Sequence, residues 1–217
     1  MELYLFLVAF LIVIIAQINV TQSYNKYSKI ESSNNLTGAD VARAILKKQG
    51  LDNIYVVETK GRLTDHYDPR RKVIRLSSEV YHETSIASLA VAAHETGHAI
   101  QHKRKYVFLG LRSIVYPLAA IGSNLGYFVI FMGLLTGVLN IFYFGILLIS
   151  MVLLFQLVTL PVEFNASRVA REELINMNLI TKGEEIGVQK MLNAAALSYV
   201  AAAIASFLNI LRLILLA

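Results

Sequence analysis

The stretch that decides the fold runs from Tyr106 to Pro161, YVFLGLRSIVYPLAAIGSNLGYFVIFMGLLTGVLNIFYFGILLISMVLLFQLVTLP, and its only charge is Arg112. About 20 apolar residues cross the hydrocarbon core of a bilayer, so this length supplies two crossings but not three with turns. Gly110, Pro117 and the run 122–124 interrupt the first half, which predicts a span that is long, kinked or partly outside the lipid. The second half, about 140–160, is cleaner.

Two more segments are long and apolar enough to cross a membrane. Leu3 to Val20 carries no charge, and because only Met1 and Glu2 precede it, we expect a retained anchor rather than a signal peptide. Asn193 to Ala217 is the fourth segment. With 56% hydrophobic and 16% charged residues, the chain is neither disordered nor a typical soluble domain. The absence of cysteine excludes disulfides and thiolate metal sites.

The basic residues gather in two polar stretches between these spans. Residues 21–105 and 162–192 hold 18 of the 20 Lys and Arg, and both lie on one side if two crossings separate them. The positive-inside rule places that side in the cytoplasm, with both chain ends outside. A net charge of +5 is a mild excess that this rule explains, so we expect no nucleic-acid partner. The partner is the lipid bilayer, and the sequence does not indicate an oligomeric state.

The expected fold is therefore a mainly α membrane protein with about four transmembrane helices and a small cytoplasmic α+β unit. The segments are a transmembrane anchor (1–21), the α+β unit (22–105), a transmembrane hairpin (106–161), a cytoplasmic helix (162–192) and a last transmembrane helix (193–217). Within the α+β unit, 40–48 reads as a short amphipathic helix and 54–58 and 72–76 as strands. We expect 72–76 to be an edge strand that pairs with an extended substrate.

One helix, expected from Ser85 to His102, carries the chemistry. It contains His94-Glu95-Thr96-Gly97-His98, the H-E-x-x-H pattern. Residues four apart share a helix face, so both imidazoles can bind one zinc ion while Glu95 takes a proton from water. The pattern is rare by chance, and burying two His and one Glu without a metal or other partners would be costly. The pattern predicts a zincin-like site.

A zinc hydrolase needs a third protein ligand. No His follows His102, which is about 12 Å of helix beyond His94, so a downstream carboxylate, or His66 or His82 upstream, has to serve. Glu163 stands out because it follows the second of two crossings, which return the chain to the side of the motif. Glu172 and Glu173 are rivals more than two turns further along.

Three stretches together resemble a known family. They are Leu63-Thr-Asp-His-Tyr-Asp-Pro69, Ala92-Ala-His-Glu-Thr-Gly-His-Ala-Ile-Gln101 and Leu160-Pro-Val-Glu-Phe-Asn-Ala-Ser-Arg168. Such stretches are similar to those of the bacterial membrane neutral zinc metallopeptidases, also called YugP-like, over nearly the whole chain. The resemblance implies a zinc-dependent peptidase in a bacterial plasma membrane. Residues 163–167 also resemble the Glu-x-x-x-Asp helix of gluzincins, although Ser167 stands where Asp would steady a His.

The expected activity is that of a zinc metalloendopeptidase with one catalytic Zn²⁺, which cleaves membrane-associated or unfolded proteins at the cytoplasmic face. His94, His98 and Glu163 hold the ion and Glu95 transfers the proton. The candidates for an oxyanion or substrate contact are His66, Tyr67, Arg168 and Tyr199. Two alternatives stay open: an intramembrane zinc protease, which the lack of any Asp within a span disfavours, and a non-enzymatic zinc-binding scaffold, which Glu95 disfavours.

Overall fold

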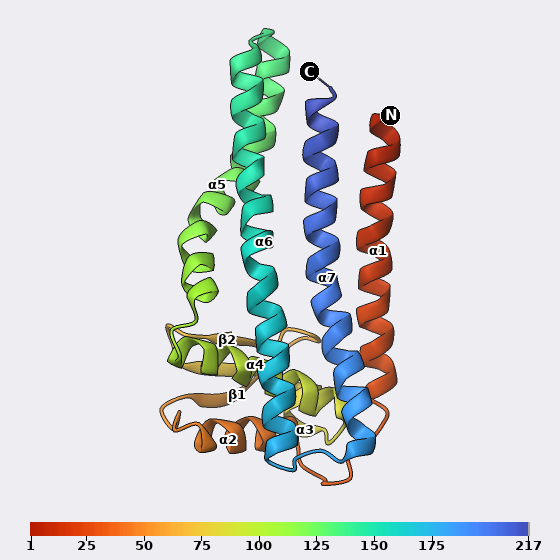
Figure 1. The fold of residues 1–217 in the computed structure, drawn as a ribbon, viewed down its shortest axis with the longest axis vertical. Helices are drawn as coiled ribbons and strands as arrows, with labels where there is room; N and C mark the ends of the chain where they lie inside the picture. The colour runs from red at the N-terminus through yellow and green to blue at the C-terminus, as the bar shows by residue number, and fades with distance from the viewer. Residues whose placement is uncertain (217) are drawn as a thin grey trace. The chain divides into compact units, whose positions relative to one another are not determined.

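A computed structural model describes residues 1–216 and shows long helices joined by short connections (Figure 1). In chain order the elements are α1 (Glu2–Tyr27), α2 (Gly38–Lys48), β1 (Tyr55–Thr59), β2 (His66–Asp68), β3 (Val73–Ser77), α3 (Ser78–His82), α4 (Ile86–Lys103), α5 (Val107–Thr136), α6 (Leu139–Asn176) and α7 (Lys182–Ile214). Four of them, α1, α5, α6 and α7, are long and apolar enough to cross a membrane. The expectation of a mainly α membrane protein with a small α+β unit is confirmed.

The chain forms two compact units, and α1, α6 and α7 contribute to both. The membrane unit comprises Met1–Ile18, Val107–Val162 and Leu197–Ala217. The sheet unit comprises Asn19–Tyr106 and Glu163–Ala196.

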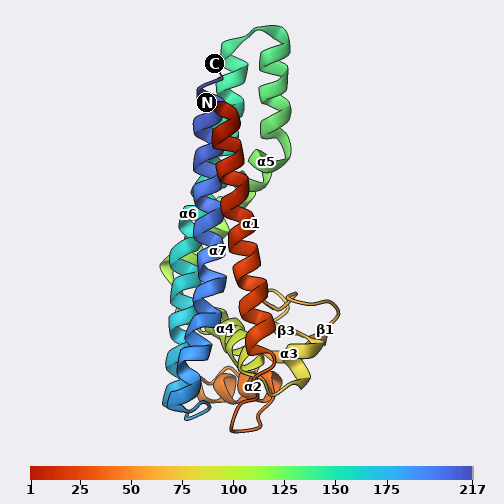
Figure 2. The ribbon, with the colours of Figure 1, turned by 90° about the vertical axis from the view of Figure 1, so that its right-hand side faces the viewer.

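Within the membrane unit, α5 and α6 form a helical hairpin, and α1 and α7 lie side by side (Figures 1 and 2). The α5 ribbon bends along its length, as the interruptions in its sequence predict, and Pro117 lies inside it (Figure 1). Glycine allows α5 to approach α6 closely, since a Cβ at Gly122 would lie 2.0 Å from the Leu148 carbonyl oxygen.

The sheet unit is built on a three-stranded sheet of order β1-β3-β2. β1 pairs parallel with β3, and β2 pairs antiparallel with it. The expected strands are confirmed, but the assignment of 72–76 to an edge is wrong because β2 covers the other side of β3. β2 escaped notice since it is three residues long and lies among turn-forming Asp and Pro. Burial of Ile74, Leu76 and Ser77 is typical of a central strand.

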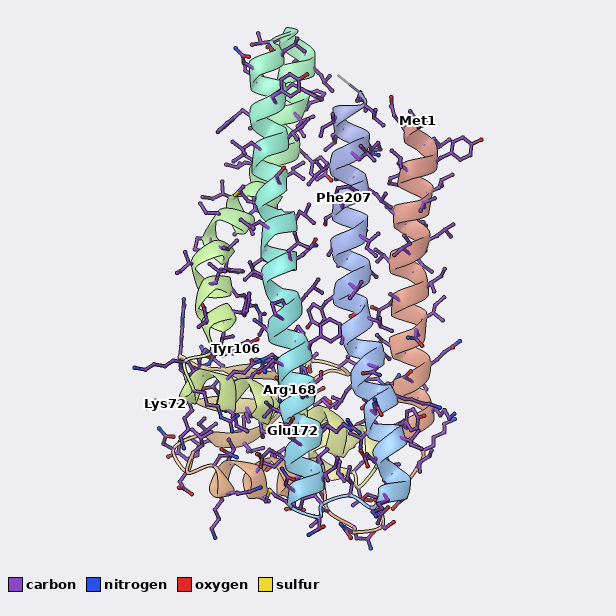
Figure 3. The ribbon with its side chains drawn as sticks, viewed as in Figure 1. Met1, Lys72, Tyr106, Arg168, Glu172 and Phe207 are labelled. Atoms are coloured by element: carbon purple, nitrogen blue, oxygen red, sulfur yellow. The ribbon has the colours of Figure 1, made fainter. Side chains whose placement is uncertain are left out.

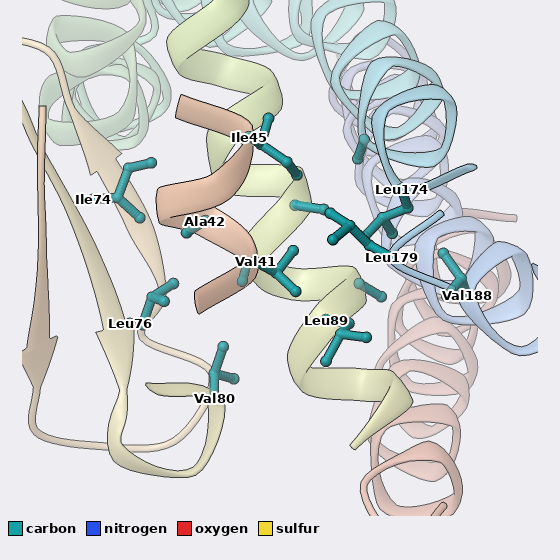
Figure 4. Close-up of a cluster of buried hydrophobic side chains, with 14 of the residues drawn as sticks. Val41, Ala42, Ile45, Ile74, Leu76, Val80, Leu89, Leu174, Leu179 and Val188 are labelled. Carbon is teal, nitrogen blue, oxygen red and sulfur yellow. The ribbon is translucent and has the colours of Figure 1, made fainter. Parts of the chain in front are cut away.

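The core of the sheet unit has three layers (Figure 4). The sheet contributes Ile74 and Leu76, and α2 and α4 form the middle layer with Val41, Ile45 and Leu89 (Figure 4). The third layer contains Leu174 of α6, with Leu179 and Val188 beyond it. The expected helix over 40–48 is confirmed as α2, which begins at a capping box between Thr37 and Asp40. α4 is thus packed between the sheet on one side and the C-terminal part of α6 on the other.

Candidate metal centre

The site is built on α4, which begins where the sequence indicates. The Ser85 hydroxyl oxygen accepts a hydrogen bond from the Ser88 backbone N–H and caps the helix. Small residues let α6 pack tightly against α4: a Cβ on Gly97 would lie 2.6 Å from the Ala166 carbonyl oxygen. The glycine of the motif therefore allows the close helix approach that brings α6 to the two histidines.

The structure brings together His94, His98 and Glu163. The Oε2 atom of Glu163 lies 3.2 Å from Nε2 of His94 and 3.5 Å from Nε2 of His98. One ligand atom from each of the three residues lies within 4.8 Å of the others. Glu163 is 2% exposed and the two imidazoles are each 14% exposed, so the cluster lies below the surface with limited access from solvent.

These distances suit a zinc ion. Two ligands that are each about 2.0–2.1 Å from a tetrahedral ion are about 3.4 Å apart, which is close to the separations of Glu163 Oε2 from the two Nε2 atoms. The donor set of two imidazoles and one carboxylate is also one that zinc hydrolases use, with a fourth position open. The residues present therefore fit a catalytic zinc ion.

Hydrogen bonds orient both imidazole rings through their far nitrogens. Nδ1 of His94 lies 3.2 Å from the Ser167 hydroxyl, and Nδ1 of His98 lies 3.0 Å from the Gln101 side-chain oxygen. The Gln101 amide in turn donates to Asn165 on α6 at 2.9 Å. With Nδ1 as the donor in each ring, Nε2 keeps its lone pair for a metal. Ser167 therefore contacts a histidine as the gluzincin resemblance implies, although as a hydroxyl.

Gln101 was not predicted to be a partner of His98, although it ends the family-like stretch 92–101. Its signal is its place three residues after His98, where helical spacing puts both side chains on one face. Burial lowers the pKa of His98, but the hydrogen bond to Glu163 and the charges of Glu95 and Glu163 outweigh it, so the pKa is raised. Acceptors therefore surround this imidazole on both nitrogens.

Glu95 is 8% exposed, and its charge acts on a second carboxylate, that of Asp65. Burial raises the pKa of Asp65, the hydrogen bonds from Ser77 oppose this, and the charge of Glu95 adds to the rise. The Asp65 side chain accepts the Ser77 backbone N–H at 2.7 Å, which joins the segment before β2 to the end of β3. Asp65 is a polar residue near the site that the sequence reasoning did not single out, although it lies inside the family-like stretch 63–69.

The four candidates for an oxyanion or substrate contact differ in position. Tyr67 packs against the core, and its hydroxyl lies 3.1 Å from Nδ1 of His102, one turn beyond His98 on α4. His66 lies on the opposite face of β2, because successive strand residues alternate. Arg168 is exposed and pairs with Glu172 at 2.8 Å. Tyr199 belongs to the membrane unit.

The other possible third ligands have different partners. Glu172 is half exposed and pairs with Arg168. Glu173 is buried, contacts Lys48 at 3.1 Å and accepts a hydrogen bond from Gln49 at 2.8 Å. His82 is exposed and lies 3.3 Å from Glu58. Among the residues that the structure describes, only His94, His98 and Glu163 form a group of three that could hold a metal.

Comparison with known proteins adds a family to this geometry. The family model described as "Putative neutral zinc metallopeptidase" matches residues 2–217. The chain belongs to this family. It is also 46% identical over 201 residues to "Putative membrane protease YugP" of Bacillus subtilis (strain 168), a match that covers 93% of this chain and 89% of the relative. No solved structure matches the chain.

Membership in the neutral zinc metallopeptidase family confirms the resemblance inferred from the three stretches. It implies zinc as the metal, in agreement with the donor set. Membership in the family favours a hydrolase that acts on peptide bonds. The four apolar helices indicate that the chain is a membrane protein.

Proposed function

We propose that this chain is a zinc-dependent endopeptidase that cleaves membrane-associated or unfolded proteins at the cytoplasmic face of the bacterial plasma membrane. The observation that carries the proposal is the cluster of His94, His98 and Glu163, together with the buried Glu95, whose charge acts on His98. In this proposal the three residues hold one Zn²⁺, and the five segments expected from the sequence describe how the chain enters and leaves the membrane.

Each side chain has a separate task. A zinc ion here supplies a Lewis acid that polarises the scissile carbonyl and makes a water molecule more acidic. The Glu95 carboxylate accepts the proton of the attacking water and donates it to the leaving amine. Ser167 and Gln101 keep the two imidazoles in the tautomer that leaves Nε2 free for the ion. Burial of Glu95 keeps its carboxylate away from competing solvent.

The edge strand β2 is the surface on which we place the substrate. Among the strands that the structure describes, it pairs with β3 alone, so its outer backbone groups are available to an extended peptide. Its Tyr67 contacts His102 of α4, so this edge runs beside the metal-binding helix. Main-chain pairing tolerates many sequences, which suits unfolded substrates. Of the four oxyanion candidates, Tyr67 has the most support because its hydroxyl contacts His102, which lies one turn beyond the zinc ligand His98 on α4.

The direct test is Glu95→Gln, measured for both zinc content and cleavage of an unfolded protein such as casein. We expect zinc to be retained and cleavage to fall by about 10²–10⁴-fold, because Glu95 transfers the proton and does not bind the ion. Glu83→Gln is the matched control, since Glu83 is exposed at the start of the loop before α4. Cleavage by Glu95→Gln at the control rate would exclude Glu95 as the base.

The cytoplasmic orientation needs its own test, and the lack of native cysteine makes one simple. We expect Lys60→Cys to resist a membrane-impermeant thiol reagent in intact cells, because the sheet unit faces the cytoplasm. Val138→Cys, in the turn between α5 and α6, should be labelled under the same conditions since that turn faces outward. The reverse labelling pattern would contradict the proposed orientation.

A further inference from the structure

Two exposed turns of the sheet unit concentrate its positive charge. One is Arg70-Arg71-Lys72, between β2 and β3, and the other is Lys103-Arg104-Lys105, which comprises the last residue of α4 and the turn before α5. All six side chains are exposed. We refer to these two segments as the basic turns. The sheet unit contains 18 basic and 14 acidic residues, so without the basic turns it has 12 against 14 and a slight negative charge.

The basic turns lie at one end of the sheet unit. The hydrogen bond between Tyr67 and His102 joins β2, just before the first turn, to α4, just before the second. Figure 3 shows Lys72 and Tyr106 at the same edge of this unit. Tyr106 leads directly into α5, one of the four helices that can cross a membrane, and Val107 is 77% exposed. The second turn therefore directly precedes the α5 span, and the hydrogen bond between Tyr67 and His102 brings the first turn to the same end of the sheet unit.

The first turn is held in shape and leaves its charges available. The Asp68 carboxylate accepts the backbone N–H groups of Arg70 and Arg71 at 2.9 and 3.1 Å, which fixes the backbone of the turn. These hydrogen bonds lower the pKa of Asp68. Asp68 also approaches the Arg71 guanidinium, at 3.8 Å, but that side chain is 73% exposed. Within residues 1–216, Arg70 and Lys72 form no ion pair.

We propose that the two basic turns together bind the phosphate-bearing headgroups of anionic phospholipids. Basic residues next to a membrane surface attract such lipids by about 1 kcal/mol each. Exposed Arg and Lys donors match phosphate oxygens, and the neighbouring aromatic and apolar residues suit the interface. Because β2 ends where the first turn begins, this contact also holds the edge strand at the membrane surface.

The test measures lipid binding without proteolysis, so it is independent of the proposed enzyme activity. The full chain is reconstituted in nanodiscs with equal phosphatidylglycerol and phosphatidylcholine, and the lipids that stay bound are counted by native mass spectrometry. The turn variant Arg70→Gln/Arg71→Gln/Lys72→Gln should lose about tenfold or more of the preference for phosphatidylglycerol. The control Lys29→Gln/Lys182→Gln/Lys190→Gln removes three exposed charges elsewhere in the sheet unit and should keep it.

Equal melting temperatures and zinc contents for the two triple variants establish that both are folded. A turn variant that keeps the preference of the control would overturn the proposal. Loss of the wild-type preference on adding millimolar inorganic phosphate, with ionic strength held constant, would also overturn it, because it would show a site for free phosphate rather than for lipid.

Discussion

The two units differ in where they place their apolar side chains. In each of the four long helices, only 11–28% of the most apolar 18-residue stretch is buried, and large side chains such as Leu147 are exposed. In the sheet unit the apolar side chains gather in one continuous core around α2 and α4, and the polar groups of the site lie beside it. Lipid solvates outward apolar side chains, whereas water does not. Burial therefore stabilises the sheet unit far more than the membrane unit. The metal centre lies in the sheet unit.

The largest effect should come from removing core volume in the sheet unit. Leu89 is completely buried on α4, five residues before His94. Leu89→Ala should therefore lower the free energy of unfolding by about 2–5 kcal/mol. Leu147→Ala removes the same atoms from a side chain that is 55% exposed on α6, and its effect should stay within about 0.5 kcal/mol. Melting temperatures of the purified proteins provide the comparison. Equal losses would mean that the two units do not differ in this way.

A smaller effect should come from the glycines at the two helix crossings. Gly97→Ala and Gly122→Ala each place a Cβ against a carbonyl oxygen of α6, Ala166 in one unit and Leu148 in the other. Each should cost about 1–3 kcal/mol. Only Gly97→Ala should also reduce zinc content, because it pushes α6, and with it Glu163, away from the histidines. Zinc content and melting temperature, measured on both variants, separate the loss of zinc from the loss of stability. Reduced zinc in Gly122→Ala would contradict the expectation that only the crossing at Gly97 positions Glu163.

Much of this architecture follows from sequence because its signals are local. Four apolar runs predict four spans, and the i, i+4 spacing of His94 and His98 places them on one face of a helix that Ser85 caps. The even number of crossings between the motif and Glu163 selected the carboxylate that the structure brings to the histidines. These inferences needed only periodicity, length and charge.

What the sequence did not reveal depends on contacts between distant segments. β2 is too short to show a strand pattern, and its pairing alone makes β3 a central strand. Gln101 and Asn165 are 64 residues apart, and nothing in either segment predicts that their amides meet. Glu173, a rival ligand by composition, is buried against Lys48 and Gln49, whose position depends on how α2 packs. Such facts require the tertiary structure.

The central claim is that Glu163 completes a three-residue zinc site with His94 and His98. Zinc content by atomic emission on purified Glu163→Ala tests it most directly, with Glu172→Ala as the control because Glu172 is exposed and lies on the same helix. Glu173→Ala is a poorer control, since removing that buried carboxylate leaves Lys48 and Gln49 without a partner. We expect Glu163→Ala to lose most of its zinc and Glu172→Ala to match the wild type. A full complement of zinc in Glu163→Ala would contradict the account.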